Sequence, residues 1–228
     1  MKSLNRFFEK VFCITCFDDI DRQIRCVKQF NKFDIDFEFM PAVDNNLLQS
    51  PHEKETGISS SELSLLIAHI MCIQKAKLHN YEKIVILEDD FKLYEDWEIR
   101  FDLFSKELPT TWSLLYLGQP QWSVGIYDVR LKYYSEHVSV CKYGCASHFM
   151  GIHKSSYDEC ISSMKSYKHP VDLYYGCIED RVETCFALTG KSLADALSIP
   201  HEKYHAKILN FDRSAYVPST LRDNCKNP

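Results

Sequence analysis

The sequence predicts an α/β fold in a single domain, and two observations carry this prediction. Strand-like and helix-like patterns alternate through the first half of the 228-residue chain, which is typical of βαβ units with right-handed crossovers. Four consecutive apolar β-formers, Ile84 to Leu87, predict a central parallel strand that is covered on both faces. We therefore expect a mostly parallel central sheet flanked by helices.

The first half divides into short elements with clear boundaries. The expected strands are 11–16, 36–40, 83–87 and 114–117, and the expected helices are 20–33, 60–78 and 97–108. The second helix has the best-defined start, because Ser59 and Glu62 have the spacing of a capping box. A polar loop is expected at 45–56.

The second half is less regular. Strands are expected at 137–142 and 146–153, joined as a hairpin through Gly144, and another at 182–188. A helix is expected from Ser155 or Ser156 to about 166, with a short helix or turn after Pro170. The sequence shows no clear linker, so we expect one domain over 1–228 with an irregular C-terminal part.

Composition limits the classes of function. With 27 Lys and Arg against 32 Asp and Glu, the net charge of −5 argues against a general nucleic-acid binder, which needs a basic surface. Hydrophobic residues make up 45% of the chain, enough for a core, but no window is long and apolar enough to span a membrane. The N-terminus lacks the pattern of a secretory signal. The ten cysteines are therefore expected as free thiols in the cytoplasm.

Three adjacent acids, Glu88, Asp89 and Asp90, follow the predicted central strand. Open α/β sheets bind ligands beyond the carboxyl ends of their strands, where these acids are expected. Adjacent carboxylates repel one another, and a nearby cation offsets that repulsion. Oxygen ligands favour Mg²⁺ or Mn²⁺, and such an ion stabilises a departing diphosphate. The alternative interpretation is a solvated acidic turn.

Several segments, taken in order, resemble glycosyltransferase family 25, the family of lipopolysaccharide and procollagen galactosyltransferases. These segments are VFCIT at 11–15 with Asp21-Arg22, FEFMPAVD at 37–44, Ser61-Glu62 with Ala68-His69, ILEDDF at 86–91, and Pro170-Val171-Asp172. The resemblance implies a GT-A type fold with a Rossmann-like sheet. It places a nucleotide-sugar donor on about 11–120 and the acceptor on the irregular C-terminal region, about 121–228.

By this resemblance the acidic triplet plays the role of the DxD motif. Asp90 is then the direct cation ligand, and Glu88 faces the ribose or a water on the cation. The resemblance leaves Asp89 open to either role. A later histidine often completes such a site, and His201 is the candidate, with His205 one helical turn further along.

The resemblance also implies contacts to the nucleotide. Arg22 is expected near the phosphates, since a guanidinium suits phosphate geometry; the alternative is a surface helix arginine. Glu62 and His69 are expected on the uracil side of the pocket. For Glu62 the helix cap is the favoured alternative, and for His69 a satisfied buried histidine.

The activity that the resemblance implies is transfer of galactose or glucose from a UDP-sugar, with inversion, to a glycan or hydroxylated protein acceptor. Such a displacement needs a base for the acceptor hydroxyl. Asp172 is the first candidate, with Glu179 and Asp180 as rivals. Two other classes stay open. A nucleotidyltransferase usually needs a glycine- and lysine-rich loop near the N-terminus, which this chain lacks, and an inactive GT-A binding module would keep only the fold.

Overall fold

The computed structural model describes residues 3–44, 47–48, 58–118, 130–142, 144, 147–178, 185–188 and 194–196. The helices are α1 (Ser3–Phe7), α2 (Ile20–Lys32), α4 (Ser60–Leu78), α5 (Trp97–Glu107), α6 (Tyr157–Met164) and α7 (Val171–Ile178), with a 3₁₀ turn, η2 (Lys154–Ser156). The strands are β1 (Lys10–Thr15), β2 (Glu38–Pro41), β3 (Lys83–Glu88), β4 (Phe91–Leu93), β5 (Leu114–Tyr116), β6 (Arg130–Tyr133), β7 (Val138–Lys142), β8 (Phe149–His153), β9 (Cys185–Leu188) and β10 (Ala194–Ala196). This order confirms the α/β class.

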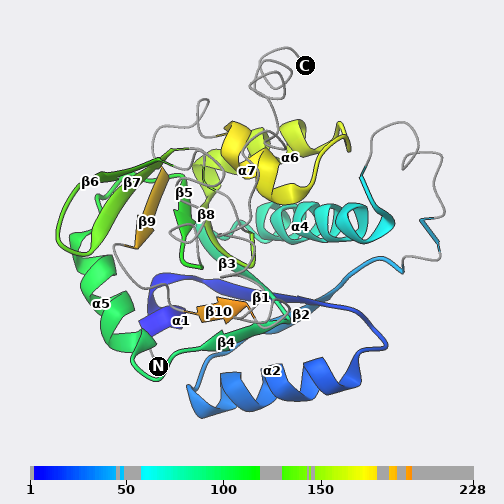
Figure 1. Ribbon diagram of the computed structural model, residues 1–228, viewed down its shortest axis with the longest axis horizontal. Coiled ribbons are helices and arrows are strands. Elements are labelled where there is room, and N and C mark those ends of the chain that lie inside the picture. The colour runs from blue at the N-terminus through cyan, green and yellow to red at the C-terminus, as the bar shows by residue number, and fades with distance from the viewer. Residues whose placement is uncertain are drawn as a thin grey trace, which may run out of the picture.

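The central sheet is mixed rather than mostly parallel. Its strand order is β2-β1-β3-β8-β5-β9-β7-β6, and β4 pairs separately with β10 (Figure 1). The expected parallel arrangement holds for β2, β1 and β3 and for the pair β5 and β9. However, β8 lies antiparallel between β3 and β5. The expected hairpin of β7 and β8 is wrong, because β5 and β9 separate these strands and β7 pairs with β6 and β9.

Alternate residues of the strands build two cores, one on each face of the sheet. Phe12 and Ile14 of β1 pack with buried residues of α4, α6 and α7. Val11 and Cys13 of the same strand pack with α1, α2 and α5 on the other face. Figure 1 shows these two groups of helices on opposite sides of the sheet. Both faces of β1 and β3 are therefore covered, and only their ends are open to a ligand.

Side-chain caps fix where the helices next to the sheet edge begin. The Ser59 hydroxyl accepts a hydrogen bond from the Glu62 N–H at 3.2 Å, and the Glu62 carboxylate accepts one from the Ser59 N–H at 2.8 Å. This confirms the predicted capping box at the start of α4. Asp19 caps α2 by accepting from the Arg22 N–H at 3.1 Å. Both helices thus begin beside the carboxyl ends of the parallel strands.

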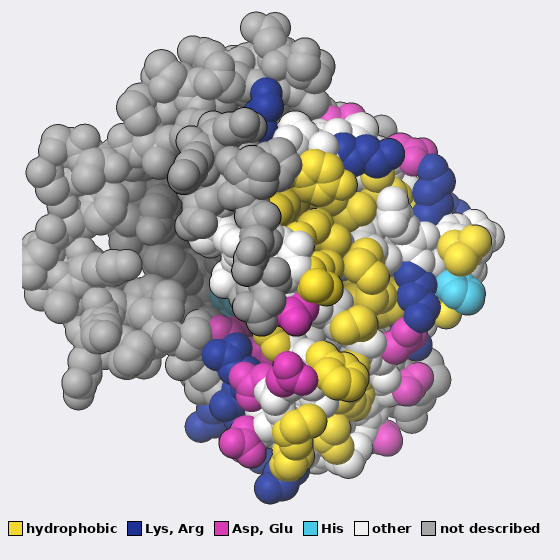
Figure 2. Space-filling view, turned by 90° about the vertical axis from the view of Figure 1, so that its right-hand side faces the viewer, with side chains coloured by type: hydrophobic (Ala, Val, Ile, Leu, Met, Phe, Trp, Pro, Cys, Tyr) yellow, Lys and Arg dark blue, Asp and Glu magenta, His cyan; other side chains and the backbone are white. Residues whose placement is uncertain are grey.

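The described surface agrees with the mildly acidic composition. Figure 2 shows acidic and basic side chains interspersed beside a band of apolar side chains, and no broad basic field on that face. Among the helices of the described segments, none combines the length and apolar character that crossing a membrane requires. The cysteines whose side chains the structure describes are free thiols.

Candidate active site

A pocket of about 160 Å³ lies where β1 and β3 end. Its walls come from the ends of β1, β2 and β3 and from α2 and α4, and the residues that line it are Ile14, Thr15, Cys16, Arg22, Ala42, Ser61, Ser64, Leu65, Glu88, Asp89 and Asp90. The carboxyl edge of parallel strands is where open α/β sheets bind ligands. The structure therefore brings Arg22 and the whole acidic triplet together in one pocket.

The middle acid of the triplet is paired. One carboxylate oxygen of Asp89 accepts from Arg22 Nη1 at 2.8 Å, and the other accepts from the Thr15 hydroxyl at 2.8 Å. The Asp89 side chain is 8% exposed, and that of Arg22 is 41% exposed. The ion pair raises the pKa of Arg22, so the guanidinium stays charged at the pocket wall.

The outer two acids lack a basic partner of this kind in the contacts that the structure describes. Glu88 Oε1 accepts from the neutral Ser147 hydroxyl at 2.7 Å. Burial, together with the negative charges of Asp90, Asp172 and Asp89, raises the pKa of Glu88 to about 8. The buried Oδ1 of Asp90 has no hydrogen-bond partner among the described residues. An all-oxygen ligand set of this kind suits a hard cation such as Mg²⁺ or Mn²⁺.

Asp172, the predicted base, lies in the first turn of α7. Its charge is one of those that raise the pKa of Glu88, so α7 brings this carboxylate toward the acidic triplet from the second half of the chain. Its Oδ1 accepts from the Leu173 N–H at 2.9 Å. Glu179, Asp180 and His201 lie outside the described residues.

Glu62 and His69, predicted as nucleotide contacts, are absent from the residues that line this pocket. The Glu62 carboxylate is engaged at the cap of α4, where it also accepts from the Ser59 hydroxyl at 2.7 Å. His69 is fully buried, and its Nδ1 lies 3.0 Å from the Tyr175 hydroxyl. Burial lowers the pKa of His69 to about 3, so the ring is neutral. For Glu62 the geometry favours the alternative, a helix cap. His69 ties α4 to α7 through Nδ1, but its buried Nε2 has no hydrogen-bond partner among the described residues, so the histidine is only half satisfied.

Sequence reasoning missed Thr15, Ser147 and Gly118 at this edge of the sheet. Ser147 reaches Glu88 only because β8 runs antiparallel beside β3, a pairing that no local pattern indicates. Gly118 follows β5, and a Cβ there would lie 2.5 Å from His148 Nε2, so a larger residue would displace the ring. The signal for Thr15 was available, because it is the last residue of the first strand.

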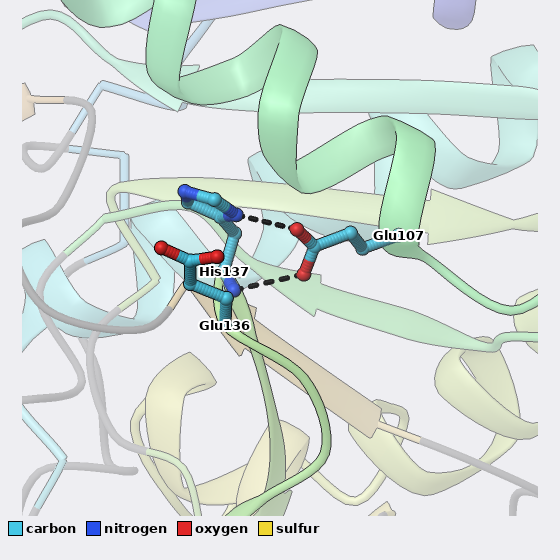
Figure 3. A group of neighbouring side chains, drawn as sticks. All are labelled: Glu107, Glu136 and His137. Atoms are coloured by element: carbon cyan, nitrogen blue, oxygen red, sulfur yellow. Dashed lines mark hydrogen bonds and ion pairs between the residues drawn. The ribbon is translucent and has the colours of Figure 1, made fainter.

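A second group of titratable side chains lies between the end of α5 and the turn before β7 (Figure 3). Glu107, Glu136 and His137 offer ligand atoms within 4.8 Å of one another. The Glu107 carboxylate accepts from the His137 N–H at 2.9 Å and lies 2.5 Å from its Nδ1. Interactions with Ser135 and His137 lower the pKa of Glu107 to about 2. These contacts join α5 to the β6–β7 turn.

The contact between Glu107 and His137 predicts a pH-dependent contribution to stability. Because the folded-state pKa lies below the ordinary value of 4.5, the ionised carboxylate stabilises the fold above about pH 4.5, and this is lost as the pH falls toward 2. Urea titrations of Glu107→Gln should therefore show a lower free energy of unfolding than wild type at pH 6 and a smaller difference at pH 3. Glu136→Gln is the matched control. An equal difference between Glu107→Gln and wild type at pH 6 and at pH 3 would contradict the lowered pKa of Glu107.

The Glu88 carboxylate predicts the opposite pH dependence of stability when EDTA removes divalent cations. Its folded-state pKa of about 8 lies above the ordinary 4.5, so the contribution of Glu88 to stability is largest below about pH 4.5 and falls as the pH rises to 8. Each unit of pKa shift corresponds to ~1.4 kcal/mol. Glu88→Gln cannot ionise and should flatten this fall in urea titrations between pH 5 and 8, whereas the exposed control Glu95→Gln should keep it. A Glu88→Gln profile parallel to wild type would refute the prediction.

Comparison with solved structures shows a shared fold in one case. A glycosyltransferase involved in the glycosylation of the major capsid of PBCV-1 superposes with a TM-score of 0.50 at 8% identity, covering 88% of this chain and 98% of that one. The inositol-1-phosphate CTP transferase from T. maritima gives a TM-score of 0.47 at 10% identity, covering 92% and 98%. Mannose-1-phosphate geranyltransferase from Thermus thermophilus gives 0.46 at 8%, covering 82% and 75%.

No curated protein sequence matches the chain. The family model of glycosyltransferase family 25 (LPS biosynthesis protein) matches residues 8–168. That range is more than half of the chain and includes every residue that lines the pocket. The chain therefore belongs to glycosyltransferase family 25 and is a glycosyltransferase.

Proposed function

We propose that this glycosyltransferase moves galactose or glucose from a UDP-sugar to a hydroxyl group of a glycan or protein acceptor, with inversion at the anomeric carbon and with Mn²⁺ or Mg²⁺. One observation supports this most directly. The buried Asp90 Oδ1 has no partner in the described part of the chain, and it lies in the same pocket wall as Glu88, whose pKa is raised. The free thiols support placing the reaction in the reducing cytoplasm.

The residues of the pocket fit a divalent cation bound with a diphosphate. Asp90 and Glu88 would hold the cation, which supplies positive charge for the departing diphosphate. Arg22 is charged and partly exposed in the same wall, so its guanidinium is placed to donate hydrogen bonds to phosphate oxygens. His201 remains a predicted further ligand outside the described residues.

Asp172 is the proposed base. Its carboxylate accepts the proton of the acceptor hydroxyl while that oxygen bonds to the anomeric carbon and the bond from this carbon to the diphosphate breaks. The support is its position on α7, close enough to the acidic triplet to raise the pKa of Glu88. Glu179 and Asp180 remain rival predictions.

Release of UDP from UDP-galactose and from UDP-glucose, with Mn²⁺ or with EDTA, tests the proposal. We expect release that requires the cation, and calorimetric binding of UDP that is stronger with Mn²⁺. Tighter binding of CTP or UTP than of UDP would indicate nucleotidyl transfer instead. A protein that binds none of these nucleotides would be an inactive binding module, and the proposal would be wrong.

A further inference from the structure

The carboxylates of the acidic triplet differ in their hydrogen-bond partners. Asp89 accepts from Thr15 on one oxygen and from Arg22 on the other, each at 2.8 Å. A cation at the same carboxylate would lie beside the guanidinium charge, which repels it. By contrast, the buried Oδ1 of Asp90 has no partner among the described residues.

The backbone of Asp89 is held as firmly as its side chain. Its carbonyl oxygen accepts from Arg25 Nη2 at 3.2 Å and from Cys26 Sγ at 3.3 Å. Arg22, Arg25 and Cys26 lie three and four residues apart, so one face of α2 is docked on this single residue. Asp89 thereby fixes both the position of α2 and the direction of the Arg22 side chain.

Arg22 remains open to a ligand in this arrangement. Its Nε pairs with Asp19 at 3.1 Å and its Nη1 with Asp89, yet the side chain is 41% exposed and lines the pocket. A guanidinium held by two carboxylates loses little conformational freedom when it meets a further anion, which favours binding.

We propose that Asp89 is a positioning residue rather than a cation ligand: it holds the Arg22 guanidinium at the pocket wall, where Arg22 binds the diphosphate of the donor. The cation is then left to Asp90 and Glu88. This inference rests on the proposed function, and it assigns the three neighbouring acids two different roles.

Two separate titrations test it: Mn²⁺ alone, followed by electron paramagnetic resonance of the free ion, and UDP in saturating Mn²⁺, followed by calorimetry. Asp90→Asn should weaken Mn²⁺ binding by about tenfold or more. Asp89→Asn should leave Mn²⁺ binding close to wild type but weaken UDP binding by about tenfold, as should Arg22→Gln. Because the Asp89→Asn and Arg22→Gln substitutions disrupt the same contact, the double variant should lose no more UDP affinity than either single variant. Asp102→Asn, which removes an exposed partner of Lys106 on α5, is the matched control.

Three results would overturn the assignment: an Asp89→Asn variant that loses Mn²⁺ as Asp90→Asn does, UDP losses that add in the double variant, or an Arg22→Gln variant that binds UDP like wild type. The Arg22→Gln result can overturn the proposal even if Asp89→Asn does not fold. Wild-type protein that binds neither Mn²⁺ nor UDP would instead overturn the proposed function itself, so the two failures are distinguishable.

Discussion

Replacing Asp90 with asparagine should lower the cation-dependent release of UDP from the sugar nucleotide by about 10³-fold or more, since a bound cation supplies several kcal/mol of charge stabilisation. Asp90 lines the pocket and is 9% exposed as a residue, and no described residue bonds its buried Oδ1. Asparagine keeps the size of the side chain but removes its charge. The measurement is kcat/KM for UDP release over a range of Mn²⁺ concentrations.

Asp102→Asn makes the same chemical change on an exposed part of α5 and should keep wild-type activity. The loss in Asp90→Asn should shrink as Mn²⁺ is raised, because weaker binding is offset by mass action. An Asp90→Asn enzyme with wild-type activity at low Mn²⁺ would show that this carboxylate does not hold the cation.

Changing Asp172 to asparagine should reduce kcat by about 10² to 10⁴, the usual contribution of a positioned general base. Binding of UDP and Mn²⁺ should stay near wild type, because the residue is proposed to act on the acceptor. The expected signature is therefore a fall in kcat with little change in the dissociation constants. It is measured by steady-state kinetics alongside calorimetry.

The matched control is Asp158→Asn on α6, whose side chain is 81% exposed and pairs with Lys77. That variant should retain full activity. If Asp172→Asn also retained kcat, the base would have to be sought at Glu179 or Asp180, the rivals that the sequence offers.

Local patterns predicted the elements of the first half of the chain because their features are local. The apolar run Ile84 to Leu87 is strand β3, and Ser59 and Glu62 cap α4 through neighbouring atoms. The acidic triplet was placed correctly at a pocket because the end of a buried strand determines the edge at which the next residues lie.

The different hydrogen-bond partners of Glu88 and Asp89 were not predictable in this way. The bonds from Thr15 and Arg22 to Asp89 join residues 74 and 67 positions apart, and Ser147 is 59 positions from Glu88. Such pairs depend on tertiary packing. Tertiary packing also explains why the predicted hairpin of β7 and β8 was wrong. These two strands are near each other in sequence, but each pairs with other strands of the sheet.

The antiparallel strand β8 also affects the order in which the protein can be assembled on the ribosome. Lys83 to Leu87 of β3 pair with His153 to Phe149 of β8, and β5 takes the other side of that strand. A nascent chain that stops short of residue 149 leaves both β3 and β5 with an open edge on this side, and such edges invite pairing with other chains. Synthesis of β8 closes them, so the edge of the sheet that carries the pocket is completed only after most of the polypeptide has emerged.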